Sequence, residues 1–81
     1  MHSRETILTP FQFNAHDILT QREQEVIVGV ANGMTTRQIA ASLGISFKTA
    51  ECHRLRLMQK LNVHSTALVV RYAVHCGLVE V

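Results

Sequence analysis

Apolar residues of this chain recur at intervals of three and four in a series of short segments, a spacing that places them on one face of an α-helix. The first segment opens at Thr20, which forms with Glu23 the capping-box pattern T-x-x-E found at helix starts. It closes at Gly33, because glycine readily adopts the left-handed conformation of a helix end. The pattern therefore predicts a helix between these limits, with the apolar stripe Val26, Ile27, Val30 and Ala31.

Two further helices are predicted on either side of a tight turn. Thr35 and Gln38 form a second capping box, T-x-x-Q, and the segment that follows them ends at Gly44. Ser46 is a suitable N-cap for the next helix, which runs without glycine or proline to about Leu61. Because so few residues separate these two helices, they have the arrangement of a helix-turn-helix unit.

A fourth helix is predicted from Ser65 to about Cys76, with Gly77 beyond it as the stop. Residues 1–18 contain a proline and show no sustained period, so we interpret them as an N-terminal extension or linker. We therefore expect one domain over residues 19–81 with an all-α fold, a four-helix bundle with a central helix-turn-helix. The apolar stripe of the fourth helix consists of Leu68, Val69, Tyr72 and Ala73.

The charge of the chain is unevenly distributed. Its 81 residues are 47% hydrophobic and 17% charged, a globular composition, and the formal net charge is only +2. However, residues 37–60 contain five basic side chains and one acidic side chain, Glu51. This concentration of positive charge in the middle of the chain is typical of a surface that binds a polyanion. The five basic residues are Arg37, Lys48, Arg54, Arg56 and Lys60.

Other features bear on the compartment and on cofactors. The chain has no apolar run near the roughly 20 residues that span a bilayer, and no signal-peptide pattern at its start. Cys52 and Cys76 lack CxxC spacing, and we expect both to be free thiols of a cytoplasmic protein. His53 has no second ligand one helical turn away, so we expect no metal site and no cofactor.

The helix-turn-helix unit occupies residues 36–55, TRQIAASLGISFKTAECHRL. Each special position has a mechanical reason. Ala40 is small where two helices would cross closely, Gly44 permits the turn, and Ile45 is expected to fill the core between the helices. The helix that follows, over about residues 47–61, would then enter the major groove of a DNA duplex.

Helical phase separates the two faces of this recognition helix. At 100° per residue, Ala50, Leu57 and Leu61 fall close to one direction, which we assign to the core. Lysine, arginine and glutamine on the opposite face can donate hydrogen bonds to base edges. That opposite face consists of Lys48, Cys52, Leu55, Arg56 and Gln59, and its flanks carry Thr49 and His53 on one side and Glu51 and Arg54 on the other.

Four blocks of the sequence together resemble the C-terminal domain of LuxR/FixJ-type (GerE-like) transcriptional regulators. They occur in the order and at the spacing of that family and cover about residues 19–79. The resemblance implies a tetra-helical domain that binds DNA in a sequence-specific way through its third helix and forms a homodimer through its fourth. The blocks are LTQREQEV at 19–26, TTRQIAASLGIS at 35–46, KTAECHR at 48–54 and MQKLNVHS at 58–65.

The resemblance also implies a role for individual residues by their position. Residues at the start of the second and third helices would contact the DNA backbone, and the middle of the third helix would lie nearest the bases. Thr35 and Thr36 would offer backbone N–H groups and hydroxyls to a phosphate, and Lys48 and Thr49 would contact the backbone or the groove edge. The residues nearest the bases would be Glu51, Cys52 and either Leu55 or Arg56. Phosphates would be held by His53, Arg54 and Lys60, and the dimer surface would consist of Leu68, Val69 and Tyr72.

Alternative functions fit parts of the pattern. Region 4 of a sigma factor, which also contacts RNA polymerase, has a similar L-T-x-R-E block, here at residues 19–23. Sigma-type chains tend to end soon after the recognition helix, whereas this chain continues into a capped apolar helix. A helix-turn-helix used only for protein contacts is disfavoured by the positive charge of residues 37–60. We expect no enzymatic activity, because the chain has no phosphate-binding glycine loop or carboxylate pair.

Overall fold

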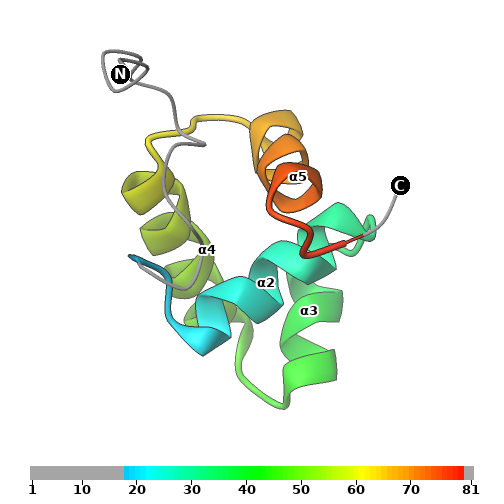
Figure 1. Ribbon diagram of the computed structural model, residues 1–81. Helices are drawn as coiled ribbons and strands as arrows, with labels where there is room; N and C mark the ends of the chain where they lie inside the picture. Colours follow the sequence, from blue (N-terminus) through cyan, green and yellow to red (C-terminus); the bar gives the residue numbers. More distant parts are fainter. Residues whose placement is uncertain (1–17, 80–81) are drawn as a thin grey trace, which may run out of the picture.

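The computed structural model of the chain describes residues 18–79, and the elements found in that range are all helices. The expected all-α fold is thereby confirmed. The extension predicted over residues 1–18 lies outside the described residues except for Ile18, which packs against the core cluster. The helices are α2 (Gln21–Ala31), α3 (Thr36–Leu43), α4 (Phe47–Leu61) and α5 (Thr66–His75) (Figure 1).

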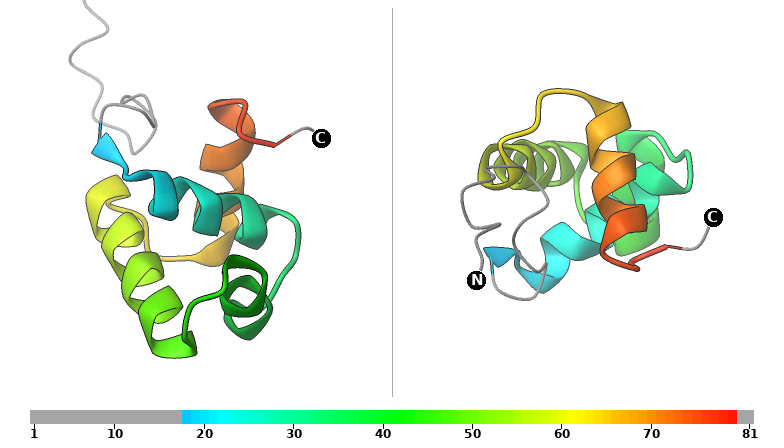
Figure 2. Two further views of the ribbon diagram at one scale, coloured as in Figure 1. Left: turned by 90° about the horizontal axis from the view of Figure 1, so that it is seen from below. Right: turned by 45° about the horizontal axis from the view of Figure 1, so that its top comes forward.

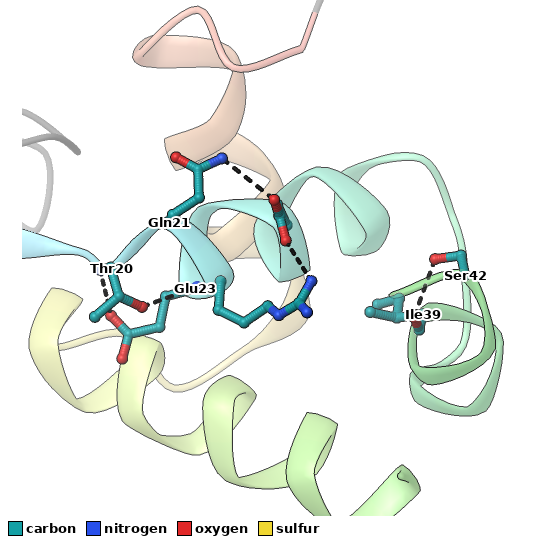
Figure 3. A network of polar contacts seen from close by, with 7 residues as sticks. Thr20, Gln21, Glu23, Ile39 and Ser42 are labelled. Atoms are coloured by element: carbon teal, nitrogen blue, oxygen red, sulfur yellow. Dashed lines mark hydrogen bonds and ion pairs between the residues drawn. The ribbon is translucent and has the colours of Figure 1, made fainter. Parts of the chain in front are cut away.

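Side-chain caps hold the helix starts where the sequence predicts them. The Thr20 hydroxyl accepts a hydrogen bond from the Glu23 backbone N–H, and the Glu23 carboxylate accepts one from the Thr20 N–H, at 3.1 and 3.0 Å (Figure 3). Thr35 and Gln38 form the same reciprocal pair at the start of α3. Each box satisfies backbone donors that a helix start leaves unpaired, so the start of each helix is encoded locally.

Helix α2 is the centre of the bundle. It packs against each of the other three helices, and α3 packs against α4 (Figures 1 and 2). Val26 and Ile27 of α2 are completely buried, together with Leu57 of α4 and Tyr72 of α5. With few aromatic residues, the core is therefore built mainly from branched aliphatic side chains drawn from every helix.

The turn between α3 and α4 positions the two helices of the predicted helix-turn-helix. Gly44 has a φ of 70°, a left-handed conformation that glycine adopts at little cost. The N–H of Ile45 donates to the carbonyl oxygen of Ala40 at 3.0 Å, which ends α3 tightly. Ala40 is buried, as predicted, but Ile45 is only half-buried and is not part of the core cluster. The expectation that Ile45 fills the core was wrong, because the tight turn leaves this residue at the edge of the bundle.

A close approach of α2 and α3 was not visible in the sequence. A Cβ atom added at Gly29 of α2 would lie 2.6 Å from Cγ1 of Ile39 in α3. Ile39 is itself buried, so it has little room to retreat. Because glycine has no side chain, the backbone of α2 can pack directly against the Ile39 side chain of α3.

The end of the chain returns to the core, as expected. Helix α5 ends at His75, with Cys76 as its C-cap, one residue earlier than predicted. Gly77 takes a φ of 73°, and Leu78 and Val79 beyond it pack partly against the buried cluster.

Candidate nucleic-acid interface

Helix α4 has the two faces that its sequence predicts. Ala50, Leu57 and Leu61 are buried, at 0%, 0% and 2% relative exposure. Helix α4 lies at one side of the bundle, where the other described helices leave part of its surface open (Figure 2). The exposed face can therefore enter a groove without unfolding the domain. That face consists, as predicted, of Lys48, Cys52, Leu55, Arg56 and Gln59, all of them exposed.

The cap at the start of α4 leaves the Thr49 side chain exposed to solvent. The Thr49 N–H donates to the Ser46 hydroxyl at 3.0 Å, and that hydroxyl donates to Thr49 Oγ1 at 2.9 Å. The hydroxyl hydrogen of Thr49 is thus left to donate outward. Lys48 stands beside it in the first turn, which contains no acidic residue. The exposed start of α4 therefore combines a cation with hydroxyl donors, which suits a negatively charged ligand.

One flank of α4 belongs to a shallow polar pocket built from several helices. Arg54 donates from Nη2 to the hydroxyl of Thr66, the first residue of α5, at 3.0 Å. Thr35 and Thr36, at the start of α3, line the same pocket. Three residues predicted to contact phosphates are thus brought together, and Thr66 joins them. Spacing along the chain offers no signal for Thr66, because it pairs with Arg54 across two helices.

Glu51, His53 and Leu55 are further residues of the recognition surface predicted for α4. Glu51 and His53 are half-buried at positions on α4 where they can still reach solvent. Leu55 projects furthest of the large apolar side chains, with 59% relative exposure. An exposed leucine on a helix that enters the major groove can contact the methyl group of thymine.

Lys60 forms an ion pair within the protein, which the sequence did not predict. Its ammonium nitrogen Nζ lies 2.8 Å from Oε1 of Glu23, whose side chain is 3% exposed. The lysine therefore pairs with a buried carboxylate and links α4 to α2. Burial by itself raises the pKa of the Glu23 carboxyl, but the hydrogen bond from Lys60, its charge and the bonds from Thr20 together lower that pKa below its ordinary value. Lys60 itself is exposed, and its phosphate contact stays a prediction.

The structure corrects the predicted dimer surface on α5, because two of its residues are buried within a single chain. Val69 and Tyr72 are 1% and 0% exposed within a single chain, because this side of α5 packs onto α2. Neither side chain can reach a second chain without opening the core. Leu68 is half-buried and also packs against the core cluster. The apolar stripe read from the sequence is thus the inner face of α5.

Two residues near the turn were not singled out as site residues by the sequence. The guanidinium of Arg37, in the first turn of α3, lies over the ring of Phe47, with its Cζ 4.6 Å from the ring centroid. A phenylalanine at the start of an amphipathic helix is ordinarily assigned to the core, and only the folded structure shows Phe47 to be 39% exposed.

Among residues 18–79, no group of three histidine, cysteine or acidic side chains is arranged to hold a metal ion. Cys52 and Cys76 are free thiols, as predicted. In the same range, no helix combines the length and apolar character that crossing a membrane requires.

Comparison with known proteins gives a consistent picture. The sequence profile of the family described as "Bacterial regulatory proteins, luxR family" matches residues 17–73. The response regulatory protein YgeK of Escherichia coli K12 is 39% identical over 67 residues, which are 83% of this chain and 46% of that protein. The oxygen regulatory protein NreC of Staphylococcus carnosus is 40% identical over 63 residues, 78% of this chain and 29% of its own length.

A solved structure agrees with these sequence matches. Full-length FixJ from B. japonicum superposes with a TM-score of 0.67 and 32% sequence identity, covering 82% of this chain and 36% of the FixJ chain. This chain spans less than half the length of each of these relatives. The likeness is therefore to one domain of larger regulatory proteins.

Proposed function

The chain belongs to the luxR family of bacterial regulatory proteins, a family of DNA-binding transcription regulators, and from this premise we propose how it binds DNA. Helix α4 enters the major groove of a duplex, with Lys48 and Arg56 on the side that meets the bases and phosphates. The observation that carries this proposal is the exposed polar face of α4 directly opposite its buried apolar stripe. A surface of this kind is available for a ligand without any cost to the core.

The pocket beside α4 would hold a phosphate of the same duplex. Arg54 contributes a guanidinium, and Thr35, Thr36 and Thr66 contribute hydroxyls around the pocket. Guanidinium groups bind phosphates through several parallel hydrogen bonds, and the pocket is open to solvent on one side. Such contacts position the protein on DNA, while the middle of α4 reads the sequence. Cys52, Leu55 and Glu51 are the residues that we propose nearest to the bases.

We also propose that the protein binds as a homodimer through α5, with a surface different from the stripe predicted from the sequence. Ala67, Val70 and Val74 recur at helical spacing on the side of α5 away from Val69 and Tyr72. Ala67 is exposed and Val74 is half-buried, while Val70 is half-buried and also packs partly against the core cluster. A second copy packed there would give twofold symmetry and so two half-sites on DNA.

The proposal includes no enzymatic activity, because the family and the named relatives are regulatory proteins. Binding to chromosomal DNA implies that the protein acts in the cytoplasm. The proposal also does not include the role of a sigma-factor region 4, since α5 follows α4 as a complete, capped helix packed on the bundle.

Selection of binding sequences from a random pool of duplex DNA tests this function directly. With the purified 81-residue chain as bait, we expect enrichment of an inverted repeat whose half-sites are one or more helical turns apart. Enrichment of a single half-site would support DNA reading by α4 and contradict the dimer. If no sequence is enriched, and the chain does not bind a mixed-sequence duplex even at low salt, DNA binding itself is contradicted.

A further inference from the structure

The contact between Arg37 and Phe47 spans the turn of the helix-turn-helix. Arg37 lies in the first turn of α3 and Phe47 is the first residue of α4, so the contact joins the starts of both helices. With the guanidinium carbon 4.6 Å from the ring centroid, the arrangement is that of a cation–π interaction. The long side chain of Arg37 is thereby held in one direction instead of sampling many rotamers.

Neither Arg37 nor Phe47 belongs to the buried core. Phe47 is 39% exposed and Arg37 is exposed. Within residues 18–79, the ion pairs join Arg22 to Glu25 and Lys60 to Glu23, so no carboxylate of this range neutralises Arg37. The guanidinium therefore carries an uncompensated positive charge at a fixed place on the surface.

The electrostatics of α3 make this placement unfavourable in the free protein. The N-terminal end of a helix carries a partial positive charge, which attracts anions and repels cations. Helix α2 follows this rule with Glu23 in its first turn, but α3 and α4 have no acidic residue there. Instead, Arg37 and Lys48 stand in the first turns of the two helices that form the DNA-binding unit. An anion bound near the N-terminal ends of α3 and α4 would be attracted by both helix dipoles and by Arg37 and Lys48.

We propose that Arg37 is an additional contact to the phosphate backbone of DNA, and that Phe47 is a positioning residue that holds its guanidinium beside the start of α4. The inference rests on the proposed function, because it needs α4 to lie in the groove. Stacking on Phe47 leaves the edges of the guanidinium, which carry its N–H donors, turned outward to a phosphate. The contact is independent of base sequence, as backbone contacts are.

The salt dependence of DNA binding tests this proposal, because each phosphate contact releases counterions. Fluorescence anisotropy with a labelled, mixed-sequence duplex would give the affinity of the 81-residue chain as salt is raised from about 50 to 200 mM. A plot of log affinity against log salt has a negative slope. For Arg37→Gln, we expect this slope to become less steep by about 0.9. The loss of affinity over that salt range should then be about 3.5-fold smaller than for the unaltered chain.

Matched variants separate this contact from a general effect of charge or folding. Arg22→Gln removes an exposed arginine that pairs with Glu25 on α2, and it should leave the slope unchanged. Phe47→Leu should weaken binding when Arg37 is present and have no further effect on the Arg37→Gln background. Circular dichroism would confirm that each variant is folded.

Several outcomes would overturn the proposal. A slope for Arg37→Gln equal to that of the unaltered chain would show that Arg37 meets no phosphate. Equal weakening by Phe47→Leu with and without Arg37 would show that the ring does not act through the guanidinium. An unaltered chain that binds the duplex with no salt dependence would instead remove the proposed function and this inference with it.

Discussion

Gly29 shows how a single residue can decide the packing of two helices. Replacing it with alanine would place a methyl group 2.6 Å from Cγ1 of the buried Ile39. Alanine favours helix formation by about 1 kcal/mol over glycine, whereas overpacking a filled core costs about 1–3 kcal/mol. We expect Gly29→Ala to lower the free energy of unfolding, by up to about 2 kcal/mol. Urea denaturation followed by circular dichroism would measure this change.

The matched control for this prediction is the same substitution in an Ile39→Ala background. The carbons that would clash are then absent, so Gly29→Ala should become neutral or stabilising. If Gly29→Ala stabilises the chain with Ile39 intact, the close approach of α2 and α3 is not a packing constraint.

Glu23 makes the stability of the domain depend on pH. Burial raises the pKa of its carboxyl, but the Lys60 and Thr20 interactions outweigh burial and hold the pKa below the ordinary value of 4.5. A carboxyl with a lowered pKa in the folded state stabilises the fold above its unfolded pKa. This contribution is lost as the pH falls from about 4.5 through the folded pKa. We therefore expect the melting temperature to fall with acidification, and to fall less in Glu23→Gln.

Glu25 offers a comparison at the surface of the same helix. Its pKa is also lowered, by hydrogen bonds from Gln21 and Arg22, but both of these bonds are exposed to solvent. Solvent screens such pairs, so Glu25→Gln should keep most of the pH dependence of the unaltered chain. Identical melting curves against pH for Glu23→Gln and the unaltered chain would contradict the role of the pair with Lys60.

At the scale of the element, substitutions on the exposed face of α4 should affect DNA binding, and substitutions on its buried face should affect stability. Lys48→Ala and Arg56→Ala remove exposed side chains, so each should leave the melting temperature unchanged. Each should weaken DNA binding, by about 1–3 kcal/mol if the side chain contacts a base. Leu57 is completely buried, and Leu57→Ala should cost about 2–5 kcal/mol of unfolding free energy. Anisotropy titrations and thermal unfolding of the three variants would measure both effects.

The reverse pattern would show that the faces of α4 are wrongly assigned. Full DNA affinity in Lys48→Ala and Arg56→Ala, with folding confirmed, would exclude this face from the interface. Unchanged stability in Leu57→Ala would mean that the side chain does not pack as the structure places it.

At the scale of the whole molecule, the proposed dimer surface of α5, formed by Ala67, Val70 and Val74, can be tested by placing a charge in it. Val74 is half-buried and lies away from the buried Val69 and Tyr72. A glutamate there would place a charge in the proposed dimer surface without entering the core. We expect Val74→Glu to weaken binding to two half-sites at least tenfold, a loss of about 1.4 kcal/mol, and to leave binding to one half-site unchanged. Anisotropy with matched duplexes would measure both.

The chain offers an internal control for this prediction. Arg22→Gln alters an exposed residue of α2 that pairs with Glu25, away from this surface, and should preserve the difference between one and two half-sites. Equal binding of Val74→Glu and the unaltered chain to two half-sites would exclude this stripe as the dimer surface.

Local features of the fold could be read from the sequence because they depend on neighbouring residues. Each helix start follows a hydroxyl side chain that pairs with a backbone N–H three positions on, as at Thr20 and Ser46. The two faces of α4 follow from the helical period, which places Leu57 inside and Arg56 outside. Interactions of this kind reach no further than one helical turn, so sequence spacing is enough to predict them.

Contacts between helices were decided only by the tertiary structure. Lys60 turns to Glu23 over 37 positions of sequence separation, and Arg54 to Thr66 over 12. Which side of α5 faces inward likewise depends on how that helix crosses α2. The period of a sequence gives the angle between side chains on one helix, but it carries no information about the crossing of two helices. The sequence by itself therefore determined the helices, their caps and the exposed face of α4, whereas the crossing of the helices decided which charges pair within the protein and which remain for DNA.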